Sequence, residues 1–311
     1  MYLMDLHLHT NFSDGENTIE DICLYAKQYN FTKLCITDHN TVAGTLALER
    51  EKKKGSIFIY GTELRLPGMP DLLIYFPSIS MPEAERLEEE LQELGKLDQD
   101  ITVLVAKDFF AEDPLTLWHK STFHNNKGNY WLGTLQLCQL ISGQKKPEIK
   151  LLDSIRAKKS YFFHLEKKYQ PQAVHDLLEK SNIKWIKKLA KKYKGHLVLA
   201  HPFREVARHY HSQNPMDYDS LSQKLKELLN KISEWDISTI EYIVANNETW
   251  WNSHFNFSFD LAEKLFFDLC NQFSFTVTFG SDYHILPSTK NISNKKMFSP
   301  LGTYCPTWLQ K

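Results

Sequence analysis

The sequence predicts an α/β fold in which parallel strands are covered by helices. Short apolar runs alternate with amphipathic helical segments, the alternation recurs in both halves of the chain, and polar residues follow several of the predicted strands. This rhythm fits either a doubly wound sheet or a barrel, since both join parallel strands through helices. With 311 residues, the chain can form one large domain or a domain with an inserted lid.

The first part of the chain alternates strands and helices in short units. Apolar residues at helical spacing predict the first helix, with Thr18 as its N-cap and Asp21 three residues further on. Gly55 marks the end of the second helix. The expected elements are a strand at 2–9, a helix at 18–29, a strand at 33–37, a helix at 42–53 and a strand at 56–60.

The middle of the chain departs from this alternation. A glutamate-rich helix is predicted at 82–97 and a strand at 101–106, and a polar, turn-like stretch follows at 119–129. We therefore expect residues 95–160 to form an insertion or lid. The main domain then comprises residues 1–94 and 161–311.

The alternation resumes in the last part of the chain. A lysine-rich run at 184–194 is interleaved with apolar residues at helical spacing, which favours a solvated basic helix face over a nucleic-acid patch. The expected elements are helices at 171–193, 221–233 and 259–272 and strands at 197–200, 239–244 and 275–279.

Composition and charge limit the classes of function. Hydrophobic residues make up 42% and charged residues 24% of the chain, as in ordinary globular proteins, and the formal net charge is −1. No overall field attracts nucleic acid or a membrane, so we expect no stable nucleic-acid complex. The N-terminus lacks signal-peptide features, and no apolar run has the length of a membrane span. The five cysteines form no Cys-x-x-Cys pair, which indicates free thiols and a cytoplasmic location.

Histidines and carboxylates cluster around the ends of predicted strands. His7 and His9 stand two apart on a strand, so their side chains point the same way, and Asp282 and His284 repeat this spacing after another strand. Either pair alone could be ordinary polar residues. However, three more residues of metal-ligand type follow predicted parallel strands: Asp38, His39 and His201. Since the carboxyl ends of parallel strands share one side of the fold, this pattern predicts a metal site.

Five segments together resemble the PHP (polymerase and histidinol phosphatase) family. They occur in the family's order and extend from Asp5 to His284. The segments are DLHLHTNFSDG at 5–15, TDHN at 37–40, GTEL at 61–64, AHP at 200–202 and GSDYH at 280–284.

This resemblance implies a distorted (β/α)7 barrel with two or three divalent metal ions at the carboxyl ends of its strands. His7, His9 and Asp282 would hold one ion, and Glu63 would bridge it to a second ion that His201 also binds. A third ion would lie among Asp14, His39 and His284. Asp5 and Asp38, beside ligands, would orient imidazole rings.

The implied activity is hydrolysis of a phosphate ester by a metal-activated water. Mixed ligation by histidine and carboxylate suits manganese, iron or zinc. The substrate would be a small phosphorylated metabolite, a nucleotide or the end of a short oligonucleotide. We expect four of the metal ligands to be catalytic as well: Asp14, His39, Glu63 and His284. The alternative is a catalytically weak PHP-like binding or regulatory module.

Two departures from the family pattern motivate that alternative. Leu73 stands where the family places another metal-binding histidine. Three outcomes are open for the second metal site: a nearby residue such as Asp71 substitutes for the histidine, the site binds its ion weakly, or the protein uses fewer ions. Asn129, Tyr130 and Trp131 align with an Arg-Pro-His element that holds the substrate phosphate in many relatives. We expect Arg204 and His209 to contact the substrate instead.

Overall fold

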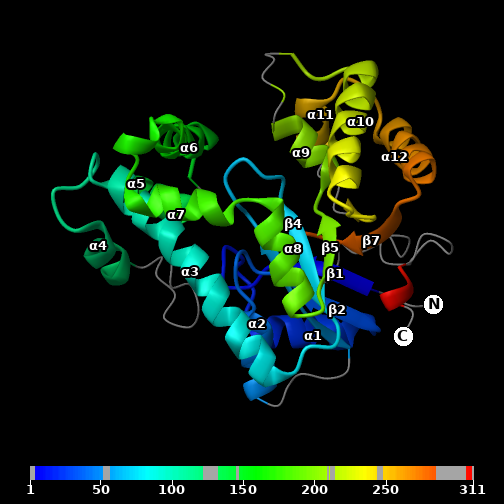
Figure 1. The fold of residues 1–311 in the computed structure, drawn as a ribbon, viewed down its shortest axis with the longest axis horizontal. Helices are drawn as coiled ribbons and strands as arrows, with labels where there is room; N and C mark the ends of the chain where they lie inside the picture. Colours follow the sequence, from blue (N-terminus) through cyan, green and yellow to red (C-terminus); the bar gives the residue numbers. More distant parts are fainter. Residues whose placement is uncertain are drawn as a thin grey trace.

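Seven strands form a single sheet that curls into a nearly closed barrel (Figure 1). The structure is a computed structural model that describes residues 4–51, 57–121, 132–144, 147–208, 210, 214–243, 248–284 and 306–309. The strands lie in chain order, and the last meets the first through a parallel bridge between Leu8 and Tyr283. The barrel expected from the sequence is therefore confirmed.

The barrel mixes parallel and antiparallel strands. Its strands are β1 (Met4–Leu8), β2 (Lys33–Ile36), β3 (Phe58–Leu64), β4 (Leu72–Phe76), β5 (His196–Leu199), β6 (Thr239–Ile243) and β7 (Thr276–Gly280). Strand β4 is antiparallel to both of its neighbours, and the other pairings are parallel. The link between β3 and β4 spans only residues 65–71, too short for the crossover that a parallel pair needs. The sequence, which suggested parallel strands throughout, did not show this reversal.

Helices cover the outside of the barrel (Figure 1). In α1 (Ile19–Tyr29), the predicted capping box between Thr18 and Asp21 is confirmed. The predicted helix at 42–53 is α2 (Ala43–Arg50), and Gly55 lies outside the described residues. The remaining elements after β5 are α9 (Pro202–Arg208), α10 (Tyr218–Glu234), α11 (Glu248–His254), α12 (Phe259–Phe273) and the short η4 (Thr307–Leu309).

A series of helices connects β4 to β5, and several of them extend to one side of the barrel (Figure 1). They are α3 (Met81–Ala106), α4 (Pro114–Lys120), α5 (Thr134–Ser142), α6 (Ile149–His164), η1 (Lys167–Tyr169), α7 (Gln172–Lys180) and α8 (Ile183–Lys192). They also form a separate apolar cluster that includes Trp118, Leu137 and Ile155. Residues 95 and 160, the limits expected for an insertion, fall inside α3 and α6. An inserted lid with those limits stays a prediction.

The strand predicted at 101–106 is wrong, because these residues continue helix α3. Ile101 and Val105 are buried and extend the apolar stripe of Leu87, Leu91 and Leu94 along that helix. The β-branched residues of this short run suggested a strand. Burial of a continuous helical face outweighs that local preference.

The described residues include four free cysteines and no candidate membrane-spanning helix. Among the described residues, no helix combines the length and the apolar character needed to cross a bilayer. Cys35, Cys138 and Cys270 are buried free thiols, and Cys23 is partly buried. Cys305 lies outside the described residues.

The interior of the barrel is filled by apolar side chains below the polar site. Ile59 on β3, Leu73 and Tyr75 on β4 and Val198 on β5 belong to this cluster. Gly61 lies between Ile59 and Glu63 on the same face of β3. A Cβ atom at Gly61 would lie 2.4 Å from the Cys35 sulfur, so the Cys35 side chain on β2 leaves no room for a methyl group there.

We predict that Gly61→Ala lowers the free energy of unfolding by about 1–3 kcal/mol, because the added methyl group overpacks the barrel. Urea denaturation measures this loss. Since the Cys35 sulfur is the nearest obstacle, Gly61→Ala combined with Cys35→Ala should lose less stability than the two single variants add up to. Strict additivity would contradict the proposed clash.

Candidate metal centre

The metal ligands predicted from the sequence lie together at one end of the barrel. They come from six separate segments: His7 and His9 from β1 and its end, Asp14 from the loop that follows, His39 after β2, Glu63 near the end of β3, His201 after β5, and Asp282 and His284 after β7. The parallel strands direct their carboxyl ends to this side of the barrel. Eight residues spread over nearly the whole sequence thus meet in one site.

Their ligand atoms form three overlapping groups. Within each group the atoms lie within 4.8 Å of one another. We name each group by one member: the Asp14 group is His9, Asp14, His39 and His284; the Asp282 group is His7, His9, Glu63 and Asp282; the His201 group is Glu63, Asp71 and His201. His9 belongs to the first two groups and Glu63 to the last two.

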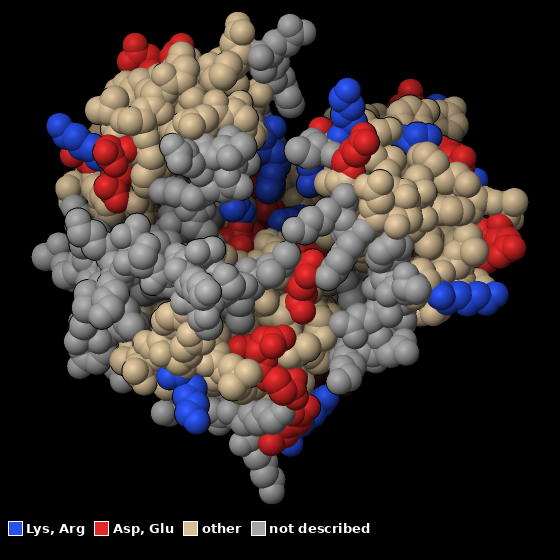
Figure 2. Space-filling model, turned by 180° about the vertical axis from the view of Figure 1, so that it is seen from behind, with Lys and Arg blue, Asp and Glu red and all other residues tan. Residues whose placement is uncertain are grey.

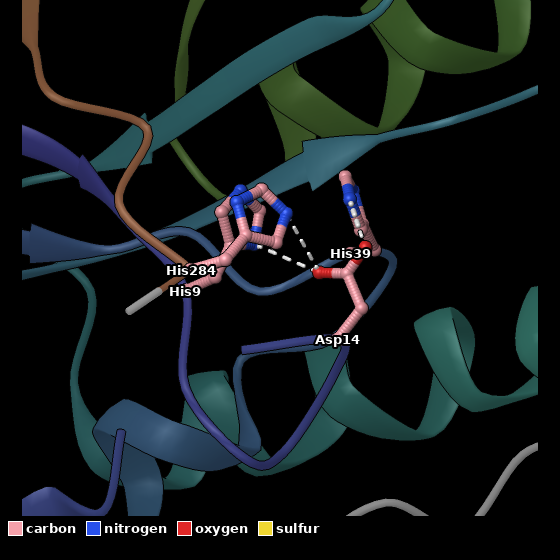
Figure 3. A group of neighbouring side chains, drawn as sticks. All are labelled: His9, Asp14, His39 and His284. Carbon is pink, nitrogen blue, oxygen red and sulfur yellow. Dashed lines mark ion pairs between the residues drawn. The ribbon is translucent and has the colours of Figure 1, made fainter. Parts of the chain in front are cut away.

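In the Asp14 group, one carboxylate lies between imidazole rings (Figure 3). Asp14 Oδ1 is 3.1 Å from His284 Nε2, and Asp14 Oδ2 is 3.3 Å from His39 Nε2. Burial opposes ionisation of Asp14, but His284 and His39 hold its pKa well below the usual value. His9 Nδ1 also lies 3.7 Å from Asp14 Oδ1, so Asp14 is an ionised carboxylate that faces three ring nitrogens.

Glu63 joins the other two groups through its separate oxygens. Its Oε2 atom lies 3.3 Å from His7 Nε2 and 3.2 Å from His9 Nε2, while Oε1 lies 2.7 Å from His201 Nε2. The carboxylate is fully buried. Burial alone would raise its pKa, but His39 and His7 hold it well below the usual value. Each oxygen thus faces a different set of imidazoles, as a bridging carboxylate requires.

The His201 group has three members because Leu73 supplies no ligand atom. Leu73 lies opposite Glu63 in the β3–β4 pairing and packs in the apolar interior of the barrel. Asp71, just before β4, is buried instead beside His201, with Oδ2 at 3.6 Å from His201 Nε2. Asp71 therefore offers a carboxylate oxygen in a group where Leu73 offers no ligand atom.

Glu241 belongs to the site but was missed from the sequence. This buried residue on β6 accepts a hydrogen bond at 2.8 Å from His7 Nδ1, and its other oxygen accepts from the backbone N–H of His201 at 3.0 Å. Burial would lower the pKa of His7, but Glu241 and Glu63 raise it to about 10. The only signal in the sequence was a single carboxylate inside an apolar strand.

Asp5 and Asp38 have other partners than expected. Asp5 accepts hydrogen bonds from the backbone N–H and the hydroxyl of Ser281, so it ties β1 to the segment that carries Asp282. Asp38 accepts from Thr10 and Ser13 and thus holds the loop that carries Asp14. Both carboxylates position ligands through the backbone of loops rather than by direct bonds to imidazole rings.

A cavity of about 380 Å³ adjoins the Asp14 group. Its walls include Asp14, His39 and three arginines from different segments: Arg65, Arg156 and Arg208. Residues of α3, α5 and α6 complete it, among them Gly95, Gln136 and Leu152. The site therefore opens into a space between the barrel and the helices that connect β4 to β5.

The residues predicted to contact the substrate are placed only in part. The guanidinium group of Arg204 contacts Asp282 Oδ2, on the side away from the oxygen that faces His7 and His9. His209 and the segment 129–131 lie outside the described residues. The substrate-binding roles of Arg204 and His209 stay predictions.

The donor set fits divalent cations. His7 Nε2 and His9 Nε2 face each other at 3.1 Å, and carboxylate oxygens surround both. Both ring nitrogens of His39 are buried without a hydrogen bond of good geometry among the described residues. Convergent imidazole nitrogens and carboxylate oxygens of this kind are the ligands of manganese, iron and zinc. The Asp14 and Asp282 groups each offer four such residues.

Fold and site together define a barrel protein with a candidate multinuclear metal centre. The chain belongs to the PHP domain family, whose model matches residues 5–240. That match covers five of the six segments that carry the site, and the segment after β7 lies beyond it.

Two curated proteins match short parts of the chain. An error-prone DNA polymerase of Symbiobacterium thermophilum is 35% identical over 71 residues, which are 22% of this chain and 6% of the polymerase. A phosphoribosyl 1,2-cyclic phosphate 1,2-diphosphodiesterase of Eggerthella lenta is 38% identical over 61 residues, 19% of this chain and 23% of that enzyme. The chain thus matches only a small part of each relative's length.

Two solved structures share the fold over nearly the whole chain. A proposed metal-dependent phosphoesterase from Bifidobacterium adolescentis has a TM-score of 0.55 and 16% identity, and the match covers 96% of this chain and 92% of that one. An amidohydrolase from Chromobacterium violaceum has a TM-score of 0.51 and 17% identity, with 99% and 95% covered. At these identities the likeness establishes the fold alone.

We predict that Glu241→Gln weakens binding of manganese by about 10–100-fold, because the amide no longer anchors His7 with a full charge. Competition against a fluorescent chelator measures the affinity. Glu263→Gln is the matched control, since Glu263 bonds to the neighbouring Tyr242 hydroxyl on the outer side of β6. Equal affinities of the two variants would rule out the anchoring role of Glu241.

Proposed function

We propose that this protein hydrolyses a phosphate ester with the help of two or more divalent metal ions held among the three groups. The observation that carries the proposal is the position of Glu63, whose Oε2 atom faces His7 of the Asp282 group and His39 of the Asp14 group. A carboxylate in this position suits two neighbouring cations. Such pairs recur in enzymes that displace groups at phosphorus.

The site residues divide the work in this proposal. His7, His9, Asp14, His39, Glu63, His201, Asp282 and His284 would hold the ions. When bound, divalent ions supply Lewis-acid chemistry, which activates water and neutralises charge on phosphoryl oxygens. Asp14 and His39 line the cavity, His284 belongs to the same group as both, and Glu63 is shared by two groups, which supports their proposed catalytic role.

The size and charge of the cavity support a small phosphorylated substrate. About 380 Å³ lies in the range of small-molecule pockets, and arginines line part of the wall. A metabolite, a nucleotide or the end of a short oligonucleotide would fit this description. The relative from Eggerthella lenta is named as a phosphodiesterase, which supports an ester of phosphate as the substrate class.

The alternative of a catalytically weak binding module is not favoured. This alternative was suggested by Leu73, which stands where a metal-binding histidine is expected, and by the missing Arg-Pro-His element. Asp71 now lies in the place where a ligand was lacking, and three arginines line the cavity. The cytoplasmic location stays a prediction.

We predict that the purified protein retains more than one transition-metal ion per chain and hydrolyses a generic aryl phosphate when manganese is added. His7→Ala should abolish this activity and lower the metal content, because His7 contributes to the Asp282 group. Elemental analysis measures the metal content, turnover of the aryl phosphate measures the activity, and circular dichroism shows whether the variant is folded. His175→Ala on α7, a partly exposed histidine that pairs with Glu179, is the control. Fewer than one ion per chain together with no hydrolysis would refute the proposed phosphoesterase function.

Turnover across a panel of substrates tests the proposed substrate class. With manganese present, we expect turnover in a panel of nucleotides, sugar phosphates and short oligonucleotides, with hydrolysis of an oligonucleotide confined to its end. The basis is the volume of the cavity, about 380 Å³, which is that of a small-molecule pocket. Cleavage within a long, end-blocked oligonucleotide would contradict this expectation.

A further inference from the structure

Two arginines compete with metal ions for one candidate ligand. Arg208 Nη2 lies 3.0 Å from Asp71 Oδ2, and Arg65 Nε lies 3.4 Å from the same oxygen. That oxygen also faces His201 Nε2, at 3.6 Å. A cation bound between Asp71 and His201 would therefore share its carboxylate oxygen with two guanidinium groups.

The Asp282 group shows the opposite arrangement. Asp282 turns Oδ1 towards His7 and His9, at 3.4 and 3.2 Å, and uses Oδ2 for its contact with Arg204. The arginine and the imidazoles thus engage different oxygens, so Arg204 does not obstruct a metal ion there. At Asp71, two arginines lie within 3.4 Å of the oxygen that faces the ring. At Asp14, a single guanidinium nitrogen of Arg65 approaches the oxygen that faces His39, and only to 3.8 Å.

The ligand count of the His201 group points in the same direction. This group offers three residues, whereas the other two groups offer four each. One of the three, Glu63, is shared with the Asp282 group. Two positive charges already compensate Asp71, so a divalent ion gains less electrostatic attraction here than in the other groups.

Both arginines also face the space in which a substrate would lie. Arg65 and Arg208 line the 380 Å³ cavity together with Asp14 and His39. Their side chains are 45% and 44% exposed, so part of each guanidinium group remains available although Asp71 is buried. The face of the molecule in Figure 2 is hollowed, and basic and acidic side chains gather inside the hollow. Planar guanidinium groups match the oxygens of a phosphate in pairs.

We propose that Arg65 and Arg208 replace a third metal ion: they hold Asp71, keep the His201 group from binding an ion tightly, and bind a phosphoryl oxygen of the substrate themselves. This inference rests on the phosphoesterase function proposed above. Glu205, also buried, fixes Arg208 from the other side through a contact of 2.8 Å to Nη1. The arginine pair is thus held in place before any substrate binds.

Counting bound ions tests the first half of the proposal. Chelator-stripped protein is loaded with excess manganese, desalted and analysed for metal. We expect about two ions per chain in the unchanged protein and about three in Arg65→Gln/Arg208→Gln, because Asp71 is then released to a cation. Arg50→Gln is the control. It makes the same type of substitution at an arginine that pairs with Glu85 on the outer surface. It should keep about two ions.

Affinity for inorganic phosphate tests the second half. Asp71→Asn removes the ligand that a third ion needs, so the arginines can be removed on this background without the gain of an ion. Calorimetry on the manganese-loaded proteins should show phosphate binding about tenfold weaker or more when Arg65→Gln and Arg208→Gln are added. Should that triple variant fail to fold by circular dichroism, Arg208→Gln alone on Asp71→Asn gives the same comparison.

Three results would overturn the inference. They are three ions retained by the unchanged protein, two ions retained after removal of both arginines, and equal phosphate affinity with and without the arginines on the Asp71→Asn background. Retention of no ion by the unchanged protein would overturn the proposed function as well. The ion count therefore separates failure of the inference from failure of the function on which it rests.

Discussion

The structure depends on a single buried carboxylate, Glu63, placed where imidazoles converge from four strands. A buried carboxylate without compensation costs several kcal/mol, so the fold must supply positive charge around it. Without metal ions, a proton on His7 supplies part of that charge: Glu241 and Glu63 raise the pKa of His7 to about 10 against the effect of burial, and Glu63 stays ionised. A divalent ion would replace this proton, so binding of metal releases it and strengthens as the pH rises. Charge balance around Glu63 thus links protonation, metal binding and stability.

Closure of the barrel is the geometric condition for this charge balance. The Asp282 N–H donates to the His7 carbonyl at 2.8 Å, and the His9 N–H donates to the Tyr283 carbonyl at 3.1 Å. These bonds join ligands from the two ends of the described fold. His201 and Asp282 also have positive φ angles, 26° and 54°, which residues other than glycine seldom adopt. Such backbone strain costs on the order of 1–3 kcal/mol per residue, and the closed barrel sustains it at the site.

The sequence predicted those parts of the site that follow apolar strands, because each such motif carries a local signal of both structure and chemistry. His7, His201 and Asp282 were recognisable in this way, and Glu63 was recognised through the family resemblance of its GTEL segment. Glu241 was not, since its meaning appears only when His7, 234 residues away, lies against it. The reversed strand β4 and the helical stretch 101–106 were missed for a related reason. Strand direction and burial are set by tertiary contacts, whereas local propensity reports only which conformations a short segment tolerates.

The division between barrel and connecting helices explains why the chemistry is easier to infer than the substrate. Metal ligands must converge within a few ångströms, which restricts both their types and their positions on the strands. The opposite wall of the cavity has no such requirement. It is built from Gly95, Gln136, Leu152 and other residues of α3, α5 and α6, whose side chains need only match the shape and polarity of one ligand. Arg65 and Arg208 stand at the boundary, because they touch a metal-ligand carboxylate on one side and the cavity on the other. Substrate preference therefore depends on contacts for which the sequence carries no motif.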